Sequence, residues 1–219
     1  MSNTAANYHK SRFKYDSGRA KVWKAITEYL GSYFDSADTV LDLGTGYGDF
    51  INGISAKKKY ALDIGPDVKK YMGKDVTFIN KPSYDLAEIP SNSLDVVFSS
   101  NLFEHLDKQE LDKTMKALLK RFKKNGKLIL IGPNFKYAYK DYFDDYTHKT
   151  IYTHVSLADA LAEYGFETIK VVPKFLPLTL KSRLPKSYLL TKAYLNAPFS
   201  PMGKQMLLIL KLNSKNDEK

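Results

Sequence analysis

One carboxylate and three evenly spaced glycines form the segment best suited to hold a small charged ligand. Asp42 is followed by glycines at 44, 46 and 48. Glycine suits such a turn because it adopts positive φ and lets a ligand approach the backbone. Dinucleotide-binding turns have the spacing G-x-G-x-x-G and place a pyrophosphate on a helix N-terminus. The spacing here is G-x-G-x-G, and a carboxylate before it would repel a pyrophosphate and attract a cation.

A second acid follows the next apolar run. Asp63 ends the segment Lys59–Asp63, which reads as a short strand. A carboxylate at the tip of that strand can accept hydrogen bonds from both hydroxyls of a ribose. Asp42 and Asp63 therefore suit a ligand with a ribose and positive charge. S-adenosylmethionine has this chemistry, since it carries an ammonium and a sulfonium group and no phosphate.

The pattern D-x-G-x-G-x-G resembles the first motif of class I S-adenosylmethionine-dependent methyltransferases of the type 11 kind, and the resemblance covers about residues 35–172. In this family an acid in a D-x-x-x-[IL]-P segment reads the adenine amino group, and the next backbone N–H meets the ring. Asp85 and Leu86 hold these positions. The resemblance implies S-adenosylmethionine as cofactor, with contacts from Asp42, Gly44, Thr45, Gly46, Gly48, Asp63, Ile64, Asp85, Leu86 and Asn101.

Three residues are candidates for catalysis on the acceptor. Methyl transfer is an in-line displacement, so aligning the reactants contributes about 7–11 kcal/mol, and a base adds about 10²–10⁴-fold for an oxygen acceptor. His105 and His148 are the candidate bases, because both are expected on the ligand-facing side. Glu104 is expected to line the cofactor or acceptor pocket. A purely structural role for either histidine stays open.

Apolar runs predict the strands that must position these residues. The predicted fold is α/β, a Rossmann-like seven-stranded, mostly parallel sheet. By resemblance, the last strand is antiparallel and inserted beside the sixth. The expected strands are Thr39–Leu43, Lys59–Asp63, Val76–Ile79, Ser93–Ser99, Lys127–Ile131, Glu167–Val172 and Met206–Leu212.

Helices are predicted from apolar spacing and end signals. One covers Arg19–Phe34, one begins after the glycine turn near Phe50, and a brief one opens at Pro66. Another is capped by Asp107 and ends at Asn125-Gly126, and the last is capped by Ser156 and stopped by Gly165.

Two long connections, 132–155 and 173–204, are expected to carry the methyl acceptor as lids. The first is rich in Tyr and Phe, which could stack on a sugar or an aromatic acceptor, although packing alone also explains them. A single domain is expected, divided into a lid and helix (1–34), a cofactor core (35–172), a basic insertion (173–204) and a last strand (205–212). The expected acceptor-binding residues are Asn134, Tyr137, Tyr142, Asp144 and Arg183.

The composition limits the class of protein. The chain of 219 residues has no cysteine, which excludes disulfides and thiolate metal sites, and it has a net charge of +10. Eight Lys/Arg and no acid lie between Ile169 and Ser214, a distribution that suits nucleic acid, an anionic membrane, a phosphorylated substrate or a plain solvated surface. No apolar run has the roughly 20 residues of a spanning helix. We therefore expect a cytoplasmic protein, with peripheral contact at the inner membrane face left open.

The segments 48–52, 132–136 and 175–185 also look like a bacterial subgroup found among genes for surface polysaccharide assembly. The predicted function is thus O-methylation of a saccharide or other small molecule. A nucleic-acid methyltransferase is suggested by charge alone, and no N-P-P-Y-type segment follows the fourth strand. A non-catalytic protein that binds S-adenosylmethionine and serves a partner enzyme is the other alternative. No metal site is predicted.

Overall fold

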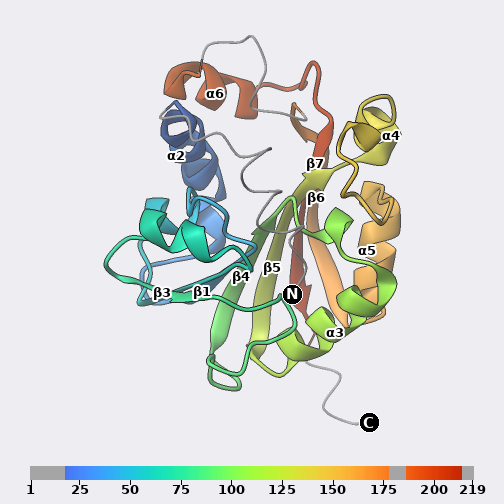
Figure 1. The fold of residues 1–219 in the computed structure, drawn as a ribbon. Coiled ribbons are helices and arrows are strands. Elements are labelled where there is room, and N and C mark those ends of the chain that lie inside the picture. Colours follow the sequence, from blue (N-terminus) through green and yellow to red (C-terminus); the bar gives the residue numbers. More distant parts are fainter. Residues whose placement is uncertain (1–17, 178–185, 214–219) are drawn as a thin grey trace.

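A seven-stranded sheet runs through the protein, and helices cover both of its faces (Figure 1). The computed structural model describes residues 18–177 and 186–213. The strand order is β3-β2-β1-β4-β5-β7-β6. The strands are β1 (Thr39–Leu43), β2 (Lys58–Leu62), β3 (Val76–Ile79), β4 (Leu94–Ser100), β5 (Phe122–Pro133), β6 (Phe166–Leu176) and β7 (Gln205–Leu212).

All strands except β7 run in the same direction. β1 pairs in parallel with β2 and β4, and β4 pairs in parallel with β5. β7 is antiparallel to both of its neighbours, β5 and β6. The predicted fold class and the inserted last strand are therefore confirmed. Since the parallel strands share one carboxyl edge, the segments that follow β1, β2, β4 and β5 all meet there.

Alternation along each strand divides the core into two layers. In β7, Leu208 and Leu210 face α3 (Lys108–Leu119) and α5 (His154–Ala162), whereas Leu207 and Ile209 face α2 (Arg19–Leu30). These residues are fully buried, as expected for a sheet covered on both sides. α6 (Tyr188–Leu195) lies outside α2 and has no buried residue (Figure 1).

The helix predicted after the glycine turn is wrong. Only a 3-10 turn, η2 (Ile51–Gly53), lies between β1 and β2. Gly48 has φ +68°, which breaks a helix immediately before Phe50. The apolar spacing that suggested a helix serves sheet packing instead, because the Phe50 ring stacks on Phe98 with centroids 3.8 Å apart.

Two helix boundaries also differ from the sequence prediction. α3 ends at Leu119 and not at Asn125-Gly126, which lie inside β5 at an irregular register. A Cβ at Gly126 would lie 2.5 Å from the Phe122 ring, so this glycine allows a close approach. In α5 the N-cap is Thr153, and Ser156 completes a capping box with it rather than capping the helix itself.

Some of the remaining elements are short 3-10 turns, whereas strand β6 is longer than the sequence predicts. The helix opened by Pro66 is a 3-10 turn, η3 (Pro66–Tyr71), and α2 is followed by η1 (Gly31–Tyr33). β6 extends through Pro173 to Leu176, which an edge strand tolerates because one side of its backbone needs no partner. The connection after β5 contains α4 (Phe135–Ala138) and η5 (Tyr142–Asp144), and η4 (Phe103–His105) follows β4.

Candidate active site

The glycine turn after β1 is a tight backbone corner. Gly44, Gly46 and Gly48 all have positive φ, at 76°, 51° and 68°. The backbone N–H groups of Gly44 and Thr45 both donate to the Leu62 carbonyl oxygen, at 2.8 and 3.1 Å, which fixes the corner onto β2. A Cβ at Gly44 would lie 3.2 Å from the Leu102 side chain. The segment after β4 therefore packs directly against this corner.

Asp42 lies beneath the corner. Its side chain is buried, and one carboxylate oxygen accepts a hydrogen bond of 2.7 Å from the Thr45 hydroxyl. Burial raises the pKa of Asp42 to about 7, the Thr45 bond opposes this rise, and the charge of Asp63 adds to it. A buried carboxylate of this kind is stabilised by a cation, so Asp42 fits a ligand that carries an ammonium or sulfonium group.

Asp63 fastens the glycine corner from the tip of β2. Its two carboxylate oxygens accept hydrogen bonds from the backbone N–H groups of Gly46, at 2.9 Å, and Gly65, at 2.8 Å. Each oxygen has a further lone pair, so a ribose hydroxyl can still donate to it. No α-helix starts between residues 44 and 57, so no helix dipole is available for a pyrophosphate. The corner fits a cationic nucleoside better than a dinucleotide.

The other expected cofactor residues lie in the connections that follow β2, β3 and β4. Asp85 is partly exposed and lies 3.4 Å from the Lys81 ammonium. Leu86 is buried, and Ile64 is 53% exposed beside Asp63. Asn101 has φ +53° directly after β4, and its side-chain oxygen accepts a hydrogen bond of 2.8 Å from Gln205 of β7.

The three candidate catalytic residues lie together. Glu104, His105 and His148 each offer one N or O ligand atom, and these atoms lie within 4.8 Å of one another. The two imidazole rings have centroids 4.9 Å apart. Glu104 and His105 belong to η4 after β4, and His148 comes from the connection after β5. The structure thus joins two segments that the sequence separates by more than 40 residues.

Burial controls the charge of this cluster. The Glu104 side chain is 3% exposed, and burial, aided by the charge of Asp145, raises its pKa to about 8. Burial, together with the nearby His148, lowers the pKa of His105. Burial alone would raise the pKa of Asp145, but hydrogen bonds from Thr147 and the two histidines hold it below its usual value. The free protein therefore keeps Glu104 protonated and His105 neutral near pH 7.

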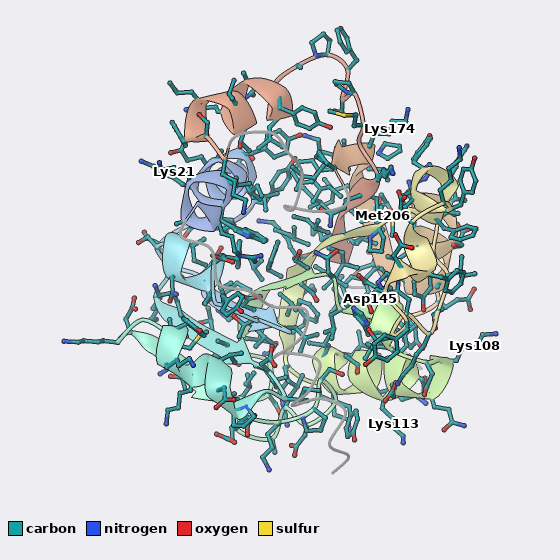
Figure 2. The ribbon with its side chains drawn as sticks, turned by 45° about the horizontal axis from the view of Figure 1, so that its top comes forward. Lys21, Lys108, Lys113, Asp145, Lys174 and Met206 are labelled. Carbon is teal, nitrogen blue, oxygen red and sulfur yellow. The ribbon has the colours of Figure 1, made fainter. Side chains whose placement is uncertain are left out.

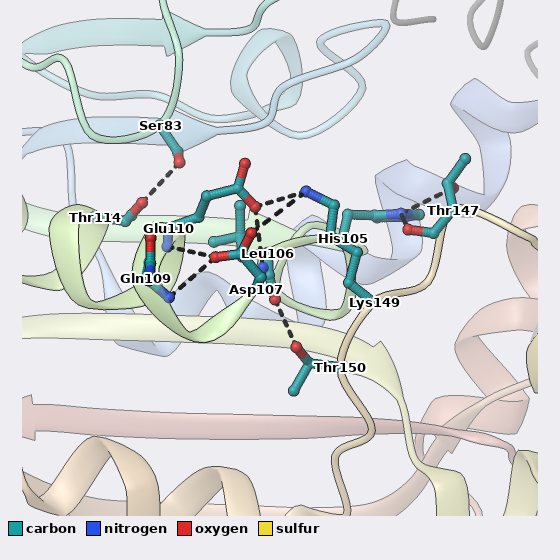
Figure 3. A network of polar contacts seen from close by, with 10 residues as sticks. All are labelled: Ser83, His105, Leu106, Asp107, Gln109, Glu110, Thr114, Thr147, Lys149 and Thr150. Atoms are coloured by element: carbon teal, nitrogen blue, oxygen red, sulfur yellow. Dashed lines mark hydrogen bonds and ion pairs between the residues drawn. The ribbon is translucent and has the colours of Figure 1, made fainter.

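The connection that carries His148 is anchored to the start of α3 (Figure 3). The Thr150 hydroxyl donates to the Leu106 carbonyl oxygen at 2.7 Å, and the Lys149 ammonium lies 2.7 Å from the Glu110 carboxylate. Glu110 also accepts the backbone N–H of Asp107, the N-cap of α3. These contacts fix the position of the connection relative to η4.

The expected acceptor residues have different surroundings. Tyr142 is fully buried, and its hydroxyl donates to the Thr150 carbonyl oxygen at 2.5 Å, so its ring supports the connection from inside rather than facing solvent. Asn134 is also fully buried, and its amide nitrogen lies 2.9 Å from both the Pro173 carbonyl oxygen and His154 Nδ1. Asp144 is exposed and Tyr137 is half-buried. Arg183 lies outside the described residues.

A groove of about 360 Å³ opens at the carboxyl end of β6. Lys174 lies in its wall, with its ammonium 4.7 Å from the centre of the Tyr137 ring. Figure 2 shows Lys174 and Asp145 at separate places on this half of the molecule, with Met206 of β7 between them. Aromatic rings from α2, α4, β6 and the loop after α6 line the groove: Tyr29, Tyr137, Phe175 and Phe199.

Several residues of the site were not predicted from the sequence. Thr147 binds His105 and Lys174 lines the groove, but neither belongs to a recognisable motif. Arg19 of α2 donates twice to one Asp49 carboxylate oxygen, at 2.9 and 2.7 Å, which ties the helix to the glycine corner. A weak signal exists only for Asp49, which follows Gly48 directly.

Comparisons with known proteins agree with this geometry. The family described as "Methyltransferase domain" matches residues 15–171. A solved S-adenosylmethionine-dependent methyltransferase from Archaeoglobus fulgidus superposes with a TM-score of 0.67 at 22% identity, over 96% of this chain and 100% of that one. A chain of the Haloferax volcanii complex between the Trm112 methyltransferase activator and a methyltransferase gives a TM-score of 0.70 at 14% identity, over 97% and 99%. No curated protein matches the sequence significantly.

Proposed function

The chain belongs to the methyltransferase domain family, with methyl transfer as its activity and S-adenosylmethionine as its cofactor, and from this premise we propose that it methylates a hydroxyl oxygen of a saccharide or saccharide-like small molecule. The groove at the end of β6 carries this proposal. Its volume of about 360 Å³ lies within the range of about 300–1,000 Å³ for small-molecule sites. Its aromatic rings suit the flat apolar faces of a sugar, and Lys174 suits an anionic group on it.

Different residues serve the cofactor and the acceptor. When bound, S-adenosylmethionine supplies an activated methyl group on a sulfonium centre. Asp42 offers a negative charge beneath the glycine corner, and Asp63 holds the corner in shape. Glu104, His105 and His148 lie on the acceptor side, where they can assist removal of the proton of the acceptor hydroxyl.

A transfer assay with radiolabelled cofactor tests the acceptor. Sugar phosphates and nucleotide sugars are compared with simple phenols and with tRNA. We expect label in the saccharide fraction and none in tRNA. Label in tRNA alone would establish the nucleic-acid alternative, and cofactor binding without transfer to any acceptor would favour a non-catalytic partner protein.

A matched pair of variants tests the groove. Tyr137→Ala should raise the KM for the saccharide by roughly tenfold, as expected for the loss of about 1.4 kcal/mol of contact, with the affinity for S-adenosylhomocysteine unchanged. Tyr139→Ala is the control, since Tyr139 lies at the end of the same short helix but is 56% exposed and does not line the groove. Equal KM values in both variants would remove the groove from acceptor binding.

We also propose peripheral contact with an anionic membrane through the outer face of α6. None of the helices within the described ranges has the length and apolar character that a membrane crossing requires. On and after α6, however, Leu189, Leu190 and Phe199 are 72%, 56% and 74% exposed. No acid lies between Ile169 and Ser214, and apolar side chains among cations suit anionic headgroups.

Co-sedimentation with vesicles tests this contact. The wild-type protein should sediment with anionic vesicles at low salt and not with neutral ones. Replacing Leu189 and Leu190 by Ser should abolish sedimentation, whereas Val155→Ser, at an exposed position on α5, should not. A protein that stays in the supernatant with every vesicle has no such surface.

A further inference from the structure

We propose that Glu104, His105 and His148 bind a divalent transition-metal ion on the acceptor side of the site. The three side chains offer two imidazole nitrogens and a carboxylate oxygen, all within 4.8 Å of one another. A modest contraction would bring them around one ion, since metal–nitrogen and metal–oxygen bonds are about 2.0–2.2 Å long. The ion's binding does not depend on the proposed function, but its role as described below rests on it.

The chemistry of the three side chains suits a cation. Imidazole is a common metal ligand, and the His105 and His148 rings lie side by side with centroids 4.9 Å apart. Glu104 is buried, and among the described residues no lysine or arginine forms an ion pair with it. A carboxyl group loses its proton when it binds a metal ion, and the ion is then the cation that a buried carboxylate needs.

The orientation of His105 is the kind that metal ligands require. Its Nδ1 lies 3.2 Å from the Thr147 carbonyl oxygen and 3.0 Å from the Thr147 hydroxyl. The same hydroxyl donates to an Asp145 carboxylate oxygen at 2.6 Å. Metal-binding histidines are usually held this way, through the ring nitrogen that does not bind the ion. Nδ1 is thereby engaged, and Nε2 is the ring nitrogen that we assign to the ion.

Backbone contacts hold the two ligand-bearing segments at a fixed distance. The backbone N–H groups of Lys149 and Thr150 both donate to the Glu104 carbonyl oxygen, at 2.8 and 3.1 Å. His148 is adjacent to Lys149, so these bonds fix its backbone relative to Glu104. The ligands are therefore preorganised by the fold, which reduces the ordering cost of binding an ion.

The donor set indicates the class of ion. Two imidazoles and one carboxylate suit zinc, iron, cobalt or manganese, and not magnesium or calcium, which prefer oxygen ligands. Three protein ligands leave coordination positions open, and a hydroxyl of the acceptor can occupy one. That hydroxyl would release its proton to water more easily. Its oxygen then forms the bond to the methyl carbon as the sulfur–methyl bond breaks, and the sulfonium becomes a neutral thioether.

Titration of the tag-free, EDTA-treated protein with Co²⁺ and Zn²⁺ tests the site. Co²⁺ binding is followed by its visible absorption, Zn²⁺ binding by calorimetry, and Mg²⁺ serves as a competitor. We expect one ion per chain and no competition by Mg²⁺. Glu104→Gln and His148→Gln should each weaken binding by more than about 100-fold, and Thr147→Val by about 10–100-fold, the range for residues that orient a ligand.

His154→Gln is the matched control, because His154 is a described histidine outside the cluster, and it should bind Co²⁺ as the wild type does. A wild-type protein that binds neither Co²⁺ nor Zn²⁺ overturns the proposal, whether or not the variants fold. So does a folded Glu104→Gln variant with unchanged affinity. Saccharide methylation by the metal-free protein would leave the proposed function intact, while metal binding without saccharide methylation would overturn the proposed function alone.

Discussion

The glycine corner and the Glu104–His105–His148 cluster lie on the same edge of one sheet but are assembled in different ways. In the corner, Thr45 binds Asp42 three residues away, and Gly46 binds Asp63 seventeen residues away. In the cluster, His105 binds Thr147 across 42 residues. Contacts between close residues produce a recognisable sequence pattern, whereas distant contacts do not. The glycine corner could therefore be recognised from a short segment, and the cluster only from the fold.

The largest expected effect is in the glycine corner. Gly46→Val should abolish binding of S-adenosylhomocysteine, because Gly46 has φ +51° and a β-branched residue is strongly disfavoured there. Calorimetric titration measures this, with NAD as a second ligand that should not bind to the wild type. Gly31→Ala is the control, since nothing lies within 4 Å of a Cβ at that position. Full affinity in Gly46→Val would show that the corner does not determine cofactor binding.

A pH dependence of stability is expected from Asp42. Its pKa is about 7 when folded and 3.8 in the reference state, so the folded protein holds a proton that the unfolded chain releases above pH 4. The free energy of unfolding therefore falls as the pH rises from 4 to 7, by at most about 4 kcal/mol. Urea denaturation of the cofactor-free protein at pH 5 and pH 8 measures this.

Asp42→Asn isolates that contribution. The variant keeps an oxygen that can accept the hydrogen bond from Thr45. It also keeps Glu104, whose raised pKa likewise makes the free energy of unfolding fall as the pH rises. The difference in unfolding free energy between pH 5 and pH 8 should therefore be smaller in the variant. Parallel pH profiles for the two proteins would contradict a protonated Asp42.

On the acceptor side, His148→Ala should lower turnover by about 100-fold or more, the contribution of a residue that assists proton removal. The affinity for S-adenosylhomocysteine should change little, because the glycine corner is held by other contacts. If the variant's turnover equals that of the wild type throughout pH 6 to pH 9, His148 is removed from the mechanism and His105 remains as the candidate.

The smallest effect is expected at the cap of α5. Thr153→Ala removes the hydroxyl that accepts the Ser156 N–H at 3.1 Å, which should cost about 0.5–2 kcal/mol of stability. Thermal denaturation measures this, and both S-adenosylhomocysteine affinity and turnover should be retained. A loss of turnover larger than the loss of stability would mean that α5 positions the acceptor side directly.

Local sequence patterns also predicted the wrong secondary structure at two places in the fold. The residues around Phe50 have helical spacing, but the positive φ of Gly48 and the packing of Phe50 on Phe98 leave only a 3-10 turn. Asn125-Gly126 has the form of a helix end, yet these residues lie inside β5, because β5 already pairs with β4 at Phe122. In both cases tertiary packing overrode a local preference.

The sequence by itself determined the existence of the strands, the fold class and the glycine corner. Buried parallel strands are continuous apolar runs, and positive φ at a tight turn requires glycine, so each leaves a direct pattern in the chain. Only the tertiary structure decided that His148 meets Glu104 and His105, that Tyr142 is buried, and that Lys174 and Tyr137 share a groove. These residues belong to different connections, and their distances depend on backbone hydrogen bonds and packing between segments far apart in sequence.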